Sequence, residues 1–155
     1  MVDSNISKII PRQFDTYIVV INNSIGTHMF RNRFADVDGI KTDVMHDGWL
    51  SCAFFVSTVL SMFKYIDSVH STVAATVMDL QKNGWEMIFE PVIGSVIVWG
   101  TSTKYNNHRH IGFYVGNDEA VSNDSDKKYP IKYHWTFKGK RKVEMILWKP
   151  DIVNF

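Results

Sequence analysis

The sequence predicts an α+β fold in which N-terminal helices pack against an antiparallel β-sheet of about five strands. Two observations carry this prediction. Before Pro91, apolar residues recur every three or four positions, which is typical of amphipathic helices. After Pro91 they alternate and are rich in β-branched and aromatic types, which is typical of strands joined by turns. Helices that precede a run of strands favour an α+β architecture.

Three helices are expected before the strands, at 12–31, 51–65 and 72–83. Pro11 lies near the start of the first helix, where proline is well tolerated. Ser51 and Ser71 are expected to be the N-caps of the other two, and Gly84 follows the last one. The intervening stretch 32–48 has two Asp-Gly steps, which predict a loop with room for a short hairpin.

Five strands are expected after Pro91, at 95–100, 109–116, 119–123, 131–137 and 142–148. Turn residues at 116–118 and 138–140 lie between consecutive strands and predict hairpin connections. The basic run 138–142 is therefore expected to be a solvated turn rather than a nucleic-acid patch.

The length of 155 residues suits a single domain that spans 1–155, and a monomer is assumed. The net charge of +1 gives no global attraction to nucleic acid or to an anionic membrane. No apolar run approaches the roughly 20 residues that a membrane span requires. The N-terminus lacks the apolar core of a secretory signal, so we expect a protein that is cytoplasmic or exported by another route.

Cys52 is the only cysteine, which excludes an internal disulfide framework and a multi-thiolate metal site. Its expected position, one residue after an N-cap, places the thiol at the positive end of a helix, where the thiolate is favoured. Among the six histidines, His110 opens an alternating strand directly after a polar loop and can face a helix end. His28 and His70 lie on or beside helices and are expected to be surface or satisfied core residues.

A nucleophilic cysteine site also needs a polar residue that orients the imidazole. If 110–115 and 119–124 pair through the turn at 116–118, the second strand ends beside His110. Three polar residues occupy this end, and each can accept an N–H: Ser122, Asn123 and Asp124. A shift of one residue in the strand register decides among them.

Three segments resemble elements of the NlpC/P60 cysteine peptidases. Residues 51–57 (SCAFFVS) are similar to the Asp-Cys-Ser-Gly-Phe-Val element of that family. Residues 91–99 (PVIGSVIVW) resemble its Pro-Gly-Asp-Leu-Val-Phe-Trp strand, and 110–117 (HIGFYVGN) resemble the His-Val-Gly-Ile-Tyr-Ile-Gly-Asn strand, which begins with the catalytic histidine. The resemblance covers 48–124, and the order of the three elements suits the family.

The resemblance implies a papain-like core with a catalytic triad of Cys52, His110 and Asn123. Asn123 is favoured because asparagine is the third residue in related papain-like sites. The third residue of the NlpC/P60 family itself, often a histidine, would fall on Ser122, so Ser122 and Asp124 are kept as alternatives. The implied activity is a thiol hydrolase that cleaves an amide bond through a thioester intermediate. The implied substrate is a peptide or peptidoglycan fragment, namely a cell-wall stem peptide, and no cofactor or metal is expected.

Three alternatives remain open at this point. A metal site at His108 and His110 could be completed by His134 or Asp124, since His-x-His on a strand is a usable ligand spacing. A binding module without catalysis would use three tryptophans to line a groove: Trp99, Trp135 and Trp148. A CHAP-like amidase, or another papain-like acyl hydrolase or transferase, shares the order of cysteine, histidine and polar residue.

Overall fold

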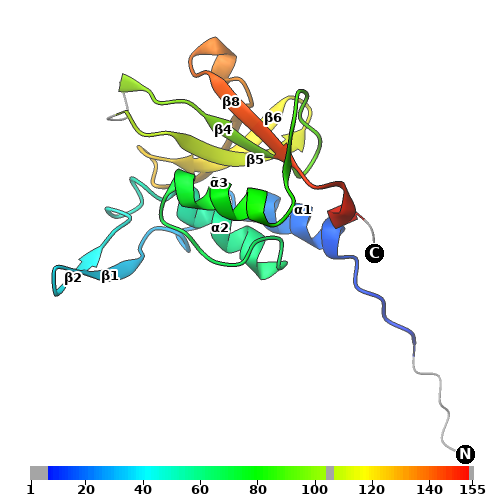
Figure 1. The fold of residues 1–155 in the computed structure, drawn as a ribbon, viewed down its shortest axis with the longest axis horizontal. Helices are drawn as coiled ribbons and strands as arrows, with labels where there is room; N and C mark the ends of the chain where they lie inside the picture. Colours follow the sequence, from blue (N-terminus) through cyan, green and yellow to red (C-terminus); the bar gives the residue numbers. More distant parts are fainter. Residues whose placement is uncertain (1–6, 104–106, 154–155) are drawn as a thin grey trace, which may run out of the picture.

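The computed structural model describes residues 7–103 and 107–153, which form a layer of three α-helices against a six-stranded antiparallel sheet. The helices are α1 (Gln13–Asn23), α2 (Cys52–Met62) and α3 (Val73–Lys82). They lie on the same side of the sheet (Figure 1). A separate hairpin, formed by β1 (Phe34–Val37) and β2 (Ile40–Asp43), projects from the helical layer. The predicted α+β class is confirmed, and so is the short hairpin before the second helix.

The sheet strands are β3 (Glu86–Ile88), β4 (Val96–Trp99), β5 (His110–Gly116), β6 (Glu119–Asp124), β7 (Tyr129–His134) and β8 (Val143–Trp148). Their order in the sheet is β3-β8-β4-β5-β6-β7, and each neighbouring pair is antiparallel. Within the described ranges the sheet therefore has one strand more than the predicted five. The additional strand is β3, a three-residue edge strand that is too short to show a clear alternation.

The connection between β7 and β8 differs from its prediction. β8 pairs with β3 and β4, whereas β7 pairs with β6 at the opposite edge, so 138–142 is not a hairpin turn. The connection contains a short 3₁₀ helix, η2 (Phe137–Gly139), and Arg141 within it is buried. The 116–118 prediction is confirmed: β5 and β6 are joined by Asn117 and Asp118, whose φ angles of 54° and 57° are those of a tight hairpin turn.

Helix α1 is shorter than predicted because its chain turns away after Asn23. The Ser24 hydroxyl donates to the Ile21 carbonyl at 2.6 Å, and Gly26 adopts a φ of 81°. The Gly26 N–H donates to Pro130 O at 2.8 Å, which pulls the chain toward β7. Met29, although spaced as for a helix, is 75% exposed. The other two helices match their predicted ranges to within three residues at either end.

The N-caps of α2 and α3 both differ in detail from their predictions. Ser51 occupies the N-cap position of α2, but its hydroxyl makes no cap hydrogen bond and is buried without a partner among the described residues. Thr72, rather than Ser71, caps α3, where its side chain accepts the Ala75 N–H at 3.2 Å. Each helix therefore begins one residue after its N-cap, and α2 begins at Cys52.

Apolar side chains cover both faces of the sheet. The face toward the helices carries Val98, Ile111 and Phe113, which are fully buried against α1 and α2. The opposite face carries Ile97 and Trp99, covered by aromatic side chains from β7 and the chain after it. Successive residues of a strand point to opposite faces, so His110 lies on the face opposite to Ile111. No helix within the described ranges has the length and apolar character needed to cross a membrane.

Candidate active site

A cavity of about 480 Å³ lies where the starts of α2 and α3 meet the chain that enters β5. Its size is in the range of small-molecule and peptide pockets. Cys52 and His110 both line it, so the structure brings the two predicted reacting residues together. Trp49 and Val73 provide apolar parts of the wall, and Arg141 provides a charged part.

The Cys52 thiol lies at the edge of strand β5. The backbone amides of Ile111, Ala53 and Cys52 itself are near enough to lower the pKa of the thiol, against the larger effect of burial. The β5–β6 pairing runs from Gly116 only as far as Phe113. The Ile111 amide lies beyond the end of this pairing and is one of the backbone groups that lower the pKa of the thiol.

The His110 imidazole is held through Nε2 by two hydroxyl groups. Ser122 Oγ is 2.8 Å from Nε2, and Tyr133 OH is 3.2 Å from it. The Ser122 hydroxyl donates its own proton to Ile111 O at 2.6 Å, so it accepts the Nε2 proton of His110. This arrangement leaves Nδ1 as the unprotonated nitrogen of the neutral ring, and Nδ1 has no hydrogen-bond partner among the described residues.

Burial favours the neutral forms of both His110 and Cys52. His110 packs against Trp99, with ring centroids 5.4 Å apart, and burial together with the nearby Arg141 charge lowers the His110 pKa to about 3. Burial raises the pKa of the Cys52 thiol, although the surrounding amides and Arg141 act in the opposite direction. The resting pair is thus a thiol and a neutral imidazole, and no hydrogen bond joins them within the described part of the chain.

Of the three alternatives for the third residue, the structure places Ser122 against the imidazole. Asn123 points to the opposite face of β6, where it is buried and its Nδ2 donates to Gly48 O at 2.8 Å. Asp124 accepts the N–H groups of Asp126 and Lys127 and so closes the turn before β7. The side-chain alternation of β6 separates Ser122 from Asn123, since only one of two adjacent residues can face His110.

Two residues of the site were missed by the sequence analysis. Tyr133 contacts His110 from β7, and Arg141 lines the cavity just before β8. Arg141 is 8% exposed, and its Nε donates to Gly100 O at 2.9 Å. Its Nη2 donates to His108 O at 2.5 Å. Neither residue has a local sequence signal, because both reach the site through long-range strand pairing.

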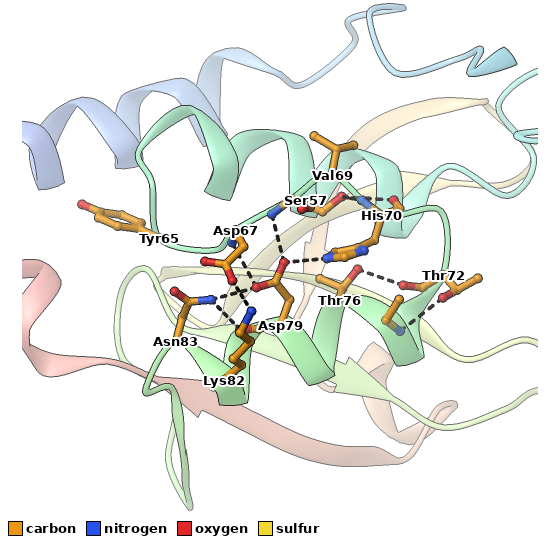
Figure 2. Close-up of polar contacts among 12 residues, drawn as sticks. Ser57, Tyr65, Asp67, Val69, His70, Thr72, Thr76, Asp79, Lys82 and Asn83 are labelled. Carbon is orange, nitrogen blue, oxygen red and sulfur yellow. Dashed lines mark hydrogen bonds and ion pairs between the residues drawn. The ribbon is translucent and has the colours of Figure 1, made fainter. Parts of the chain in front are cut away.

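The cavity wall at Ser71–Ala74 is held by a polar cluster centred on Asp79 (Figure 2). The Asp79 carboxylate accepts bonds from four groups between 2.6 and 3.0 Å away: the N–H groups of Asp67 and Ser68, His70 Nε2 and Asn83 Nδ2. Burial raises the pKa of this carboxyl, but the hydrogen bonds outweigh burial and lower it overall. The Ser57 hydroxyl holds the His70 backbone at its N–H and its carbonyl. The predicted structural role of His70 is confirmed.

The geometry bears on the alternative sites as well. No three His, Cys, Asp or Glu side chains within residues 7–103 and 107–153 are grouped closely enough to hold a metal ion. His134 Nδ1 is occupied by Thr136, whose hydroxyl is 2.8 Å away. Trp99 and Trp135 pack on the face away from the helices, whereas Trp148 packs against the helical core, so these tryptophans do not share one groove.

No protein-family model matches the chain, and a search of curated proteins gives no match. The assignment of function therefore depends on the chemistry of the site and on the segments that resemble NlpC/P60 peptidases.

Proposed function

We propose that the protein is a thiol hydrolase of the NlpC/P60-like, papain-like type that cleaves an amide bond. Cys52 is the nucleophile, His110 is the general base and acid, and Ser122 orients the imidazole. One observation carries this proposal: Cys52 and His110 line one cavity, and His110 is anchored through Nε2 so that Nδ1 is the basic nitrogen. Asn123, the residue expected from the resemblance, takes a structural role in the proposal.

The reaction begins with transfer of the thiol proton to His110 Nδ1 as the sulfur attacks the amide carbonyl carbon. Collapse of the tetrahedral intermediate breaks the carbon–nitrogen bond, and the imidazolium returns its proton to the leaving amine. The acyl group then remains on Cys52 as a thioester. Water, deprotonated by His110, attacks the thioester, and the products are a carboxylic acid and the free thiol.

The start of α2 supplies the stabilisation that the oxyanion requires. The backbone amides of Cys52 and Ala53 act on the sulfur, which is the position next to the carbonyl carbon under attack. They belong to the first turn of an 11-residue helix, so the helix dipole adds positive potential there. Burial of the site strengthens both effects, because the local dielectric is low.

The proposed substrate is a stem peptide of peptidoglycan, which the resemblance to NlpC/P60 peptidases implies. The mixed apolar and polar lining supports a peptide as the substrate, since Trp49 and Val73 can pack on side chains while Ser71 and Thr101 can bond to polar groups. A CHAP-like amidase would cut the same polymer at a different amide bond. The identity of the scissile bond therefore separates these two activities.

Mass spectrometry of peptidoglycan fragments after incubation with the protein tests the proposal. We expect two products whose masses add up to the mass of the substrate plus one water. Neither Cys52→Ala nor His110→Ala should form these products. Equal product formation by Cys52→Ala would overturn the nucleophile assignment. If no fragment is cut but a thioester or ester probe acylates Cys52, the protein is another acyl hydrolase. Binding without acylation or cleavage would identify a binding module.

A further inference from the structure

We propose that Tyr133 is a second positioning residue for His110, which shares the Nε2 proton with Ser122 while Nδ1 exchanges a proton with the thiol. The inference rests on the proposed role of His110 as general base and acid. It starts from a contact: the Tyr133 hydroxyl oxygen lies 3.2 Å from Nε2, and Ser122 Oγ lies 2.8 Å from the same atom. The two oxygens accept one N–H together, as the longer and the shorter branch of a three-centre hydrogen bond.

The register of the sheet brings Tyr133 within reach of His110. In the β6–β7 pairing Tyr133 lies opposite Ala120, and Ser122 is two residues further along β6 on the same face. Ala120 is fully buried and carries only a methyl group, so the long tyrosine side chain can pass over β6. Its hydroxyl therefore reaches a residue of β5, although β5 and β7 are not paired with each other.

The Tyr133 ring is held in place by Phe137, whose backbone is strained. The centroids of these two rings are 4.4 Å apart, and Phe137 also contacts Trp99 at 5.0 Å and His110 at 6.0 Å. Phe137 has a φ of 52°, which a bulky side chain rarely adopts. Such strain persists only where the surrounding contacts enforce it, and it is concentrated at functional sites. Here it places an aromatic side chain against the rings of both Tyr133 and His110.

The Tyr133 hydroxyl serves the imidazole rather than the packing of its own ring. A phenol oxygen buried among aromatic rings loses its hydration, and a polar partner must offset that loss. This hydroxyl contacts His110 Nε2, and the Ser122 side chain is near enough to lower its pKa against the larger effect of burial. Phenylalanine would keep the ring contacts without burying a hydroxyl, so the oxygen is explained by its contact with Nε2.

Two neutral hydroxyl groups anchor the imidazole differently from a carboxylate. A carboxylate beside Nε2 would favour the imidazolium even in the resting site. Hydroxyl oxygens leave the resting ring neutral, and their bonds strengthen when Nδ1 takes up the thiol proton, because the N–H of a charged ring is the stronger donor. Tyr133 therefore contributes most during proton transfer, and such a contribution raises kcat rather than lowering KM.

Tyr133→Phe tests this role, and Tyr129→Phe is the matched control. Both variants lose one hydroxyl from β7, but Tyr129 stacks on His28, with ring centroids 5.8 Å apart. NMR of the ¹⁵N-labelled histidine side chains reports the hydrogen bond at Nε2, and the His110 signals are those that disappear in His110→Gln. In Tyr133→Phe we expect the Nε2–H proton resonance to move upfield, while Ser122 keeps the proton on Nε2. Tyr129→Phe should leave this resonance unchanged.

Hydrolysis rates give the second measurement. We expect kcat of Tyr133→Phe to fall about tenfold with KM within about twofold of the parent, and Tyr129→Phe to match the parent. An unchanged Nε2–H resonance in folded Tyr133→Phe overturns the proposal, and so does an equal shift in Tyr129→Phe or an unchanged kcat.

Ser122→Ala decides the question if Tyr133→Phe does not fold. Tyr133 is then the remaining acceptor at Nε2, so the Nε2–H resonance should persist in this variant. Its loss through fast exchange with water overturns the proposal. The NMR measurements use no substrate, so their failure is distinct from a failure to find hydrolysis, and they decide alone if the parent cuts no fragment.

Discussion

His110 and Ser122 are joined by a hydrogen bond of 2.8 Å, and its direction is set because the Ser122 hydroxyl donates to Ile111 O at 2.6 Å. The serine thus accepts the Nε2 proton and determines which tautomer the imidazole adopts. The same bond places the basic nitrogen, Nδ1, away from β6. A small side chain in the neighbouring strand in this way determines which ring nitrogen is available for chemistry.

Substitution of Ser122 and of Asn123 should have separate effects. Ser122→Ala removes the Nε2 acceptor, so we expect amide hydrolysis to slow by about tenfold or more with little loss of stability. Asn123→Ala leaves the buried Gly48 carbonyl without its donor, so we expect a loss of about 2 kcal/mol in the free energy of unfolding. Hydrolysis rates and urea unfolding of both variants measure this. A larger activity loss in a folded Asn123→Ala would restore Asn123 as the orienting residue.

The buried His110 should make stability sensitive to acid. The His110 pKa of about 3 in the folded protein lies below the ordinary value of 6.5, so the unfolded chain takes up the proton first as the pH falls. The stabilising contribution is complete above about pH 6.5 and declines toward about pH 3. His110→Gln removes this term, so the difference in unfolding free energy between parent and variant should narrow by about 3 kcal/mol between about pH 6.5 and about pH 4.

Urea unfolding at a series of pH values checks this expectation. The acidic groups with lowered pKa, such as Asp43 and Asp79, also destabilise the fold in acid, but they are present in both proteins and cancel in the difference. Parallel pH curves for parent and His110→Gln would show that the imidazole is not held in the neutral form.

Gly112 should be intolerant of a side chain. A Cβ at this position would lie 2.7 Å from both Ser122 Cβ and Val121 O, and 3.1 Å from the Trp99 ring. We expect Gly112→Ala to cost about 3 kcal/mol or more, because backbone and packed side chains must move. Gly39→Ala is the control: its φ of 80° is strained for alanine, but no atom lies within 4 Å, so it should cost about 1 kcal/mol. Thermal unfolding of both variants would rank them; equal losses would contradict the prediction.

The buried Asp79 cluster should contribute more to the free energy of unfolding than an exposed ion pair does. Asp79→Asn weakens the bonds from the Asp67 and Ser68 amides and from His70, so we expect a loss of about 2 kcal/mol. Asp67→Asn removes the exposed ion pair with Lys82 and should change the urea midpoint very little. If the two variants unfold at the same urea concentration, the buried cluster does not hold the α3 segment.

Local sequence patterns predict where the helices lie, whereas contacts between residues far apart in the sequence determine where the helices end. The second helix followed from its apolar spacing and from Ser51, and the structure starts it at Cys52. The first helix was extended too far because Ile25 and Met29 continue its spacing, although Gly26 ends it by binding to Pro130 in β7. No pattern near residue 26 contains this contact, because the partner lies about a hundred residues away in the sequence.

The candidate site divides in the same way. Cys52 and His110 were identified from their places at the start of a helix and of a strand, and both line the cavity. The choice between Ser122 and Asn123 depends on the β5–β6 register, because a shift of one residue exchanges the residue that faces His110. The sequence does not define the ends of this hairpin closely enough to fix the register. The basic run 138–142 predicts a solvated turn only if β7 and β8 are neighbours; β8 instead lies between β3 and β4, and Arg141 is buried.

The position of β8 in the sheet also has a consequence for folding: β3 and β4 can be joined only after β8 is available. β8 follows the other strands of this sheet in the sequence, yet it lies between β3 and β4, and β3 has no other partner among the described strands. Until this segment has been synthesised, one side of β4 has no partner strand and Arg141 is absent from the cavity wall. Assembly of the cavity wall therefore waits for the segment that carries Arg141 and β8, although Cys52 precedes that segment by almost ninety residues.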